Sequence, residues 1–248
     1  GFRAAFVNEL VKLFKKKKII VAAILSALAV LIGQAAVTAV NLGFGLRVAG
    51  SVEFPLLVLP IFAYTILPLF STFTAIDMFN GEYNANSMKL TLTRPVSRFG
   101  VFCSKVAGLA VFIMGNLLFV MLLTLLTGFL FNPVSEGWLG IVRVVIAYVA
   151  TFLPVFVFTL LVVLLCNMIR SGLAVFFLAV LLFICFYVLS MFFSHLSSFF
   201  ITSMFDWYTL WISEEVNVLL LFRRMLLLIG CGIMLFTAAF YAFDRKDI

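Results

Sequence analysis

The feature that most constrains this chain is a series of long apolar runs that recur along all 248 positions. Each run has about 18 or more mostly apolar residues, and there are too many of them for the buried helices of one soluble core. Hydrophobic residues make up 65% of the chain and charged residues 11%, whereas soluble domains hold about 45–50% and 25%. The sequence therefore predicts an all-α integral membrane protein with a single transmembrane domain over residues 1–248.

Six of these runs are long enough to cross a bilayer as helices, because about 20 residues at 1.5 Å each cover roughly 30 Å of hydrocarbon. The second run contains Pro55, Pro60 and Pro68, so kinks are expected where proline removes backbone hydrogen bonds. The six spans are predicted at residues 19–42, 54–79, 101–131, 140–166, 173–193 and 218–243.

Residues 1–18 have a different pattern, which predicts an amphipathic helix lying on the membrane surface. The apolar residues that recur there at helical spacing are Phe2, Phe6, Leu10, Leu13 and Phe14. A cleaved signal peptide is the alternative, but its apolar core has only about 7–15 residues. The first span is therefore expected to be retained.

Basic residues orient the six spans. With the amino terminus in the cytoplasm, all but four of the 17 Lys and Arg residues lie in or beside cytoplasmic segments. The four exceptions are Arg47, Arg143, Arg223 and Arg224. This positive-inside bias predicts that both termini are cytoplasmic. The net charge of +7 is thus interpreted as a topology signal, and nucleic acid is not an expected partner.

The sequence carries no motif of an enzyme. G-x-x-x-x-G-K-[ST], H-E-x-x-H and G-x-S-x-G are absent, and His195 is the only histidine, so no imidazole cluster can form. The four cysteines lie in or beside apolar runs without a C-x-x-C pair and are interpreted as small buried hydrophobes. They are Cys103, Cys166, Cys185 and Cys231. No catalytic, cofactor-binding or metal-binding residue is expected in this chain.

Ionisable side chains are scarce within the spans, whereas proton- or ion-coupled carriers usually need them as relays. Asp77 is the one candidate, and it sits near the end of a span. We expect it to be a solvated helix end or the partner of a nearby base. An autonomous secondary carrier is therefore disfavoured.

The longest polar interruption is FNGEYNANSMKLTLTRPVSRFGVFCSK, residues 79–105. A hairpin between two spans needs only a few residues, so this segment is expected to form a structure of its own. "NANSMKLTLTRP" can make a short helix that begins at an Asn or Ser cap and ends before Pro95. Its basic surface would suit a soluble partner; the alternative is a helix held on anionic lipid headgroups.

Four parts of the sequence resemble the membrane subunit of ABC-2 type transporters, a permease family that includes bacterial drug, lantibiotic and bacitracin exporters. These parts are the basic amino-terminal helix, "MFNGEY", "LTLTRPVSRFGVFCSK" and the terminal "FDRKDI". The likeness extends over the whole chain in length and span number and implies a type V exporter-like transmembrane fold. Where the family usually has Gly-Thr after the residue matching Glu82, this chain has Asn86-Ser87.

The resemblance implies a coupling helix within residues 80–100 that fits a groove of a separate P-loop ATPase, which would bind the ATP and Mg. The residues expected to couple the two subunits are Glu82, Lys89, Arg94, Pro95, Arg98 and Lys105. Two permease copies, identical or related, would export a drug, an antimicrobial peptide or a lipid-like compound across a bacterial plasma membrane. The alternative is a scaffold or sensor subunit of an ATPase-coupled complex that transports nothing.

Similar transporters line their substrate path with spans two and five. The residues that this comparison selects here are Tyr64, Thr65, Ser71, Thr72, Phe176, Phe183 and Tyr187. The alternative is that the aromatic side chains face lipid or the core, as many must in a chain with 31 Phe.

Two further segments carry patterns of their own. The first span has a stripe of small residues that predicts close packing against another span: Ala22, Ser26, Ala29, Gly33 and Ala36. Residues 194–217 are predicted to form an extracytoplasmic interfacial or re-entrant region. Trp207, Tyr208 and Trp211 would lie there in an aromatic belt, or the segment would act as an external gate, as in the family that the chain resembles.

Overall fold

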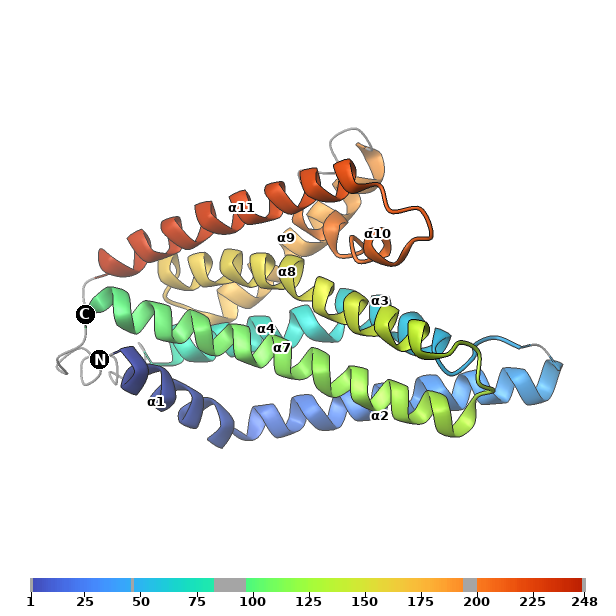
Figure 1. Cartoon of the computed structure of the whole chain (residues 1–248). Helices are drawn as coiled ribbons and strands as arrows, with labels where there is room; N and C mark the ends of the chain where they lie inside the picture. The colour runs from blue at the N-terminus through green and yellow to red at the C-terminus, as the bar shows by residue number, and fades with distance from the viewer. Residues whose placement is uncertain (1, 46, 83–96, 194–199, 247–248) are drawn as a thin grey trace.

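The computed structural model describes residues 2–45, 47–82, 97–193 and 200–246, which form an elongated bundle of helices without β-strands (Figure 1). By length and composition, five single helices in these ranges can cross a membrane. They are α2 (Lys17–Phe44), α7 (Arg98–Phe131), α8 (Trp138–Met168), α9 (Gly172–Phe192) and α11 (Val218–Asp244). The all-α membrane fold predicted from the sequence is thus confirmed.

The second predicted span is a bent pair of helices that brings the number of candidate spans to six. Its axis bends by 43° between α3 (Glu53–Tyr64) and α4 (Ile66–Ile76), which continues into the π-helical turn η1 (Asp77–Gly81). Pro68 cannot donate a backbone hydrogen bond to Tyr64, and Thr65 leaves the helical conformation at φ −123° and ψ −78°. The break therefore lies where the carbonyl of Tyr64 loses the helical hydrogen bond that Pro68 cannot donate.

The other two prolines leave α3 unbroken. Pro55 lies in the first turn of α3, where a backbone amide needs no partner within the helix, and Pro60 lies inside the helix. Only one of the three predicted kinks thus forms a break between helices.

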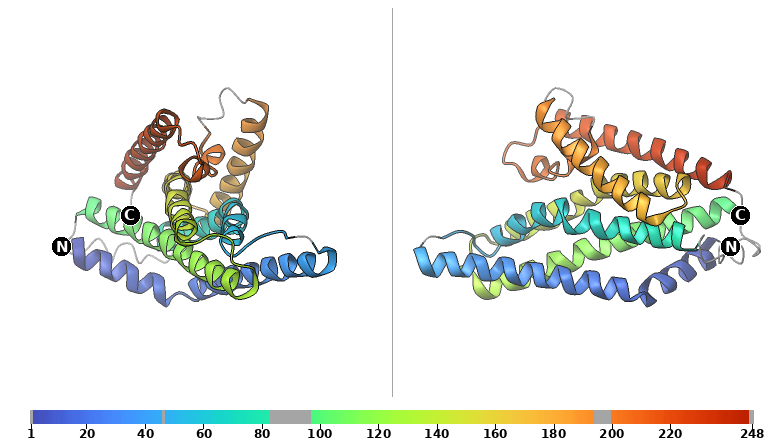
Figure 2. Two further views of the ribbon diagram at one scale, coloured as in Figure 1. Left: turned by 45° about the vertical axis from the view of Figure 1, so that its right-hand side comes forward. Right: turned by 180° about the vertical axis from the view of Figure 1, so that it is seen from behind.

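The helix α8 runs through the middle of the bundle. Figures 1 and 2 show α9 and α11 on one side of it and α1 (Phe2–Lys15) and α2 on the other. Tyr148 of α8 is fully buried, and its hydroxyl donates to the carbonyl of Pro55 at 3.0 Å. This hydrogen bond satisfies a polar group in the core and fixes α3 against α8.

Residues 200–212 lie against α8. They contain the short turns η3 (Ile201–Met204) and α10 (Thr209–Ile212). The Trp207 indole donates to the carbonyl of Ala150 at 2.6 Å, and the side chains of Trp207 and Tyr208 are buried. Both side chains thus pack against α8, which offers the indole an acceptor and an apolar surface. Their place in an interfacial aromatic belt stays a prediction.

Buried polar pairs hold α2 against α7. Gln34 and Asn132 exchange two amide hydrogen bonds of 2.9 and 3.1 Å, while the Ser26 hydroxyl donates to Asn116 at 3.4 Å. In a membrane, such bonds replace the hydrophobic driving force that lipid does not supply between helices.

The buried face of α2 follows only the first part of the predicted stripe. It consists of Ala22, Ser26, Val30, Gln34 and Val37. Ala36 is exposed, because the amide pair at Gln34 sets which side of the second half of the helix faces α7. Ala29 and Gly33 are half-buried, and a Cβ at Gly33 would lie 3.9 Å from the ring of Phe54 on α3. The predicted small-residue face is thus packed as far as Gly33, and only Ala36 departs from it.

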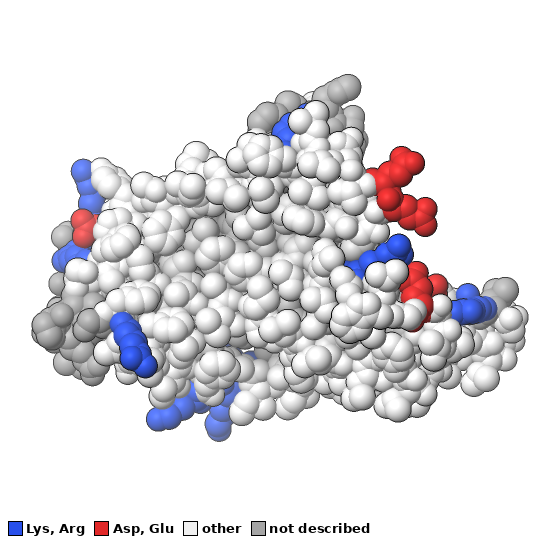
Figure 3. All heavy atoms as spheres, viewed as in Figure 1, with Lys and Arg blue, Asp and Glu red and all other residues white. Residues whose placement is uncertain are grey.

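Charge is concentrated at the ends of the bundle. Figure 3 shows a broad uncharged surface between mainly basic side chains at the end where both termini lie and a mixture of acidic and basic side chains at the opposite end. Chain ends on the same side agree with an even number of spans. The uncharged surface in between is what a bilayer core requires.

A side chain at Gly128 is predicted to destabilise the bundle, because a Cβ there would overlap the carbonyl oxygen of Ser51. Gly128→Ala should cost about 1–3 kcal/mol of stability. The matched control is Gly115→Ala in the same helix, whose Cβ meets nothing within 4 Å. Thermal unfolding in detergent measures both, and equal midpoints for the two variants would contradict the close approach of α7 to Ser51.

Candidate functional site

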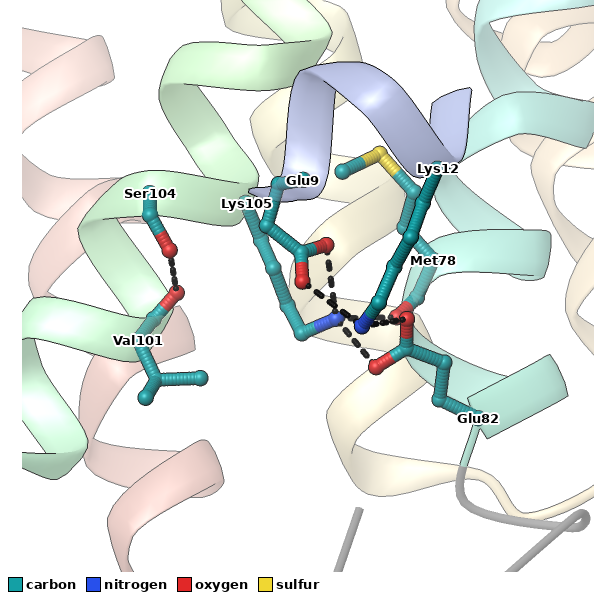
Figure 4. Close-up of polar contacts among 7 residues, drawn as sticks. All are labelled: Glu9, Lys12, Met78, Glu82, Val101, Ser104 and Lys105. Carbon is teal, nitrogen blue, oxygen red and sulfur yellow. Dashed lines mark hydrogen bonds and ion pairs between the residues drawn. The ribbon is translucent and has the colours of Figure 1, made fainter. Parts of the chain in front are cut away.

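A buried lysine lies at the centre of the candidate site, where three helical segments meet at the end of the bundle that carries the termini. Lys105 of α7 is 0% exposed. Its Nζ contacts Glu82 Oε2 at 2.6 Å, the Met78 carbonyl oxygen at 3.0 Å and Glu9 Oε2 at 3.2 Å (Figure 4). An ammonium group has three N–H donors, so these three acceptors satisfy it completely.

Lys12 closes the arrangement from α1. Its Nζ lies 3.0 Å from Glu9 Oε1 and 3.2 Å from Glu82 Oε1. Each carboxylate thus bridges two ammonium groups, and the four formal charges of Glu9, Lys12, Glu82 and Lys105 sum to zero. We call these four residues the charge cluster.

Because the charge cluster is largely buried, its charges depend on one another, and loss of one leaves the others without a partner. Removing a charged group from water costs several kcal/mol, which is offset only where partners with good geometry satisfy the charge. Glu9 is 3% exposed and Glu82 13%. If Lys105 were lost, the two buried carboxylates would lie beside one another with only the half-exposed Lys12 between them.

The charges of the cluster also shift the pKa values of Glu82 and Lys12, its two more exposed members. Burial alone would raise the pKa of Glu82, but the Lys105 and Lys12 charges and hydrogen bonds outweigh it and lower the pKa below 4.5. Burial would lower the pKa of Lys12, but Glu9 and Glu82 outweigh it and raise the pKa above 10.5. Both side chains are therefore charged at neutral pH.

The charge cluster joins α1, α7 and the end of η1. Glu82 directly follows η1 and precedes residues 83–96, which lie outside the described part of the chain. A second ion pair, Lys18 with Asp77 at 2.8 Å, fixes the start of η1 to α2. Asp77 is thus the partner of a nearby base, as expected from the sequence.

A third contact fixes η1 to the turn between α8 and α9. Asn80 is buried, and its Nδ2 donates to the carbonyls of Ile169 at 2.7 Å and Arg170 at 3.1 Å. The segment that leads into residues 83–96 is therefore held by α1, α2, α7 and the α8–α9 turn together.

The residues predicted to couple the chain to an ATPase fall into two groups. Lys89, Arg94 and Pro95 lie outside the described residues. Glu82 and Lys105 belong to the charge cluster, and Arg98 donates to the Asp244 carbonyl at 2.6 Å, which joins the start of α7 to the end of α11.

Three residues of this site were not predicted from the sequence: Glu9, Lys12 and Asn80. A signal was present: Glu9 and Lys12 lie three residues apart on one helix, and Lys105 stands at the start of a long apolar run. No sequence pattern, however, indicates that these groups meet.

A separate cavity of about 170 Å³ lies beside the break between α3 and α4, between these helices, α8 and α9. Five of the seven residues predicted for the substrate path line it: Tyr64, Thr65, Thr72, Phe176 and Phe183. Ser71 is buried instead, and its hydroxyl donates to the Pro68 carbonyl. Tyr187 lies at the rim, edge-on to Tyr64 with ring centroids 5.8 Å apart.

This cavity has an apolar wall with few polar groups. The rings of Phe73 on α4 and Phe176 on α9 stack with their centroids 4.8 Å apart. Tyr64 and two threonines supply the hydroxyl groups of the lining. Such a lining suits an apolar or amphipathic molecule. Within the described ranges, no group of three His, Cys, Asp or Glu side chains could hold a metal ion.

A family model of ABC-2 family transporter proteins matches residues 5–185, well over half of the chain. The chain belongs to this family. The match includes all of the charge cluster and the whole cavity lining, whereas α11 lies beyond it. Membership makes the chain a multi-pass membrane permease of the ABC exporter type, a transport component that is not itself catalytic. A search of curated proteins gives no significant match.

Loss of Lys105 is predicted to destabilise the ABC-2 permease far more than loss of an exposed lysine. Lys105→Met should cost about 3–5 kcal/mol, because it leaves buried carboxylates without their partner. Lys18→Met removes a largely exposed pair and should cost about 0–1 kcal/mol. Thermal unfolding and the rate of tryptic cleavage within α1 measure the difference.

The double variant Glu9→Gln/Lys105→Met is the internal control, since it removes one carboxylate together with the ammonium group. It should recover part of the loss. Equal stability of Lys105→Met and Lys18→Met would contradict the buried network.

Acid is predicted to weaken the charge cluster. Because the pKa of Glu82 is lower in the fold than the 4.5 of an ordinary glutamate, its contribution is complete above about pH 5 and declines as pH falls through the folded pKa. Lys12 has a raised pKa, so its contribution declines only above about pH 10. The difference in thermal midpoint between the wild type and Glu82→Gln should shrink from pH 5 to pH 3. A constant difference would contradict the assignment.

Proposed function

We propose that this chain is the membrane-spanning subunit of an exporter whose energy comes from a separate P-loop ATPase. The observation that carries the proposal is the charge cluster, because it fixes both described ends of the segment that resembles a coupling helix. Glu82 lies just before residues 83–96, and Arg98 begins α7 just after them. A partner that pushes on this segment would therefore act on firmly held helices.

Force applied at Glu82 has a direct path to the cavity. The turn η1 continues α4, and α4 carries Thr72 and ends at the break beside Tyr64. Because η1 is held to α7 and to the α8–α9 turn, α4 would move together with these elements. Bending at Thr65 would then shift them relative to α3 and change the cavity wall at Tyr64. Closure of the ATPase subunits on ATP and Mg would thus open and close the cavity through a rigid lever and a hinge.

The expected coupling residues take different roles in this proposal. Lys89, Arg94 and Pro95 would contact the ATPase. Lys105 is fully buried, so it would act by holding Glu82 and α1 in place. Arg98 would secure the start of α7 through its hydrogen bond to α11.

The cavity supports a hydrophobic or amphipathic substrate, such as a drug, an antimicrobial peptide or a lipid-like compound. Its volume of about 170 Å³ is below the roughly 300–1,000 Å³ of typical ligand pockets, which favours a path completed by a second permease copy. The distribution of basic residues supports cytoplasmic termini, and the family resemblance supports a bacterial plasma membrane.

Charge reversal at Arg94 is predicted to weaken binding of the partner ATPase without affecting insertion of the chain into the membrane. The tagged Arg94→Glu variant is purified from its native membrane in mild detergent. The amount of P-loop ATPase bound to it should be lower than in the wild type by about 10-fold or more, as expected for loss of a charged interface contact. Arg143→Glu, at the opposite end of the bundle, is the control. Equal ATPase recovery with Arg94→Glu, or none with the wild type, would contradict coupling through this segment.

Filling the cavity is predicted to impair transport while leaving ATPase binding intact. Val180 lines the cavity, whereas the neighbouring Leu181 faces outward and is 58% exposed. Val180→Phe should reduce ATP-driven uptake of substrate into inverted vesicles several-fold, because it occupies the cavity, and Leu181→Phe should not. Flux that is absent in the wild type despite a bound ATPase would instead favour a scaffold or sensor subunit.

A further inference from the structure

A second concave site lies on the outside of the bundle, where α1 and α2 meet α7. It is a groove of about 210 Å³ and is separate from the cavity between α4 and α9. Its lining residues are Phe14, Ile19, Ala22, Ala23, Val111, Phe112, Gly115, Asn116 and Phe119. Eight of these are apolar, and Phe14, Val111 and Phe119 form an exposed rim.

The mouth of the groove is strongly basic. Phe14 and Ile19 both line the groove, and the four residues between them are Lys15, Lys16, Lys17 and Lys18. Lys18 is paired with Asp77, whereas the other three have no carboxylate partner in the described part of the chain. Three uncompensated positive charges therefore lie where an apolar molecule would enter.

The start of α2 adds to this positive field. The helix has 28 residues, and Lys16 at its N-cap makes no side-chain capping hydrogen bond. The free backbone amides and the helix dipole of such a terminus favour a bound anion. Charge, backbone donors and an apolar groove thus coincide.

We infer that the junction of α1 and α2 binds an anionic glycerophospholipid. Its phosphate lies on Lys15–Lys17 and the start of α2, and one acyl chain lies in the groove against α7. Ile19 and Ala22 line the groove directly after the four lysines, and the rise from Lys18 to Ala22 is about 6 Å. An acyl chain attached to a phosphate at the lysines would therefore enter the groove within one turn of α2.

This inference does not depend on coupling to an ATPase, because it uses only the surface of α1, α2 and α7. A bound lipid would hold α1 at the membrane surface from its carboxyl end, about one turn beyond the charge cluster's contact at Lys12. The site therefore differs from the transport cavity in both position and role.

The test is native mass spectrometry of the full chain in detergent, titrated with phosphatidylglycerol or phosphatidylcholine. The wild type should retain one phosphatidylglycerol per chain with at least about 10-fold preference over phosphatidylcholine. Lys15→Gln/Lys16→Gln/Lys17→Gln should lower affinity on the order of 100-fold, because each juxtamembrane lysine contributes about five-fold.

The groove is tested separately from the charge. A Cβ at Gly115 meets nothing within 4 Å, so Gly115→Leu should fill the groove without disturbing the fold and abolish retention. Gly43→Leu is the control, since its Cβ is equally unhindered and lies near the other end of α2. Thermal unfolding of both variants verifies that they are folded.

Four outcomes would overturn the inference. Equal retention of the two lipids would indicate a general acyl groove, and unchanged binding by Gly115→Leu or by the triple lysine variant would remove one half of the site. Displacement of the lipid by millimolar inorganic phosphate would indicate an anion site without an acyl component. A dimer mass that Gly115→Leu abolishes would show that a second copy covers the groove.

Discussion

The structure depends on the need to satisfy a lysine that is completely buried. Lys105 requires three acceptors and a compensating negative charge, and these come from Glu9, Glu82 and the Met78 carbonyl. Glu9 lies on α1, Met78 and Glu82 lie at η1, and Lys105 itself lies on α7, so the network joins three segments that are far apart in the sequence. Satisfying one ammonium group therefore fixes α1, η1 and α7 relative to one another, and the segment after Glu82 begins from a rigid position.

Elsewhere in the bundle, uncharged buried polar groups also have to be paired by hydrogen bonds. Between helices in lipid, apolar contact alone gives little specificity, so buried polar pairs decide which faces meet. Gln34 with Asn132 sets the face of α2, Tyr148 with Pro55 sets α3 against α8, and Asn80 binds the α8–α9 turn. A single proline, Pro68, then supplies the break beside the cavity.

The sequence predicts the helices well because a membrane span depends on local composition. The six spans, the break in the second and the amphipathic first helix can all be read from hydropathy, proline positions and periodicity. Five of seven predicted path residues also come together, since spans two and five pack side by side and share one face.

Contacts between distant residues could not be predicted in this way. The meeting of Glu9 with Lys105, separated by 96 positions, depends on the angle between α1 and α2, which no local pattern determines. The burial of Trp207 likewise depends on an acceptor at Ala150. Both contacts escape prediction because tertiary structure decides whether a polar atom faces water, lipid or protein.

The most direct test of the account is the distance between spin labels at Val11 on α1 and Leu122 on α7, two exposed positions, in a background without the four cysteines. The account predicts one narrow distance distribution in the otherwise native chain. With Lys105→Met it predicts an additional, longer population as α1 detaches. An unchanged narrow distribution in the Lys105→Met protein would show that the charge cluster does not hold these helices together.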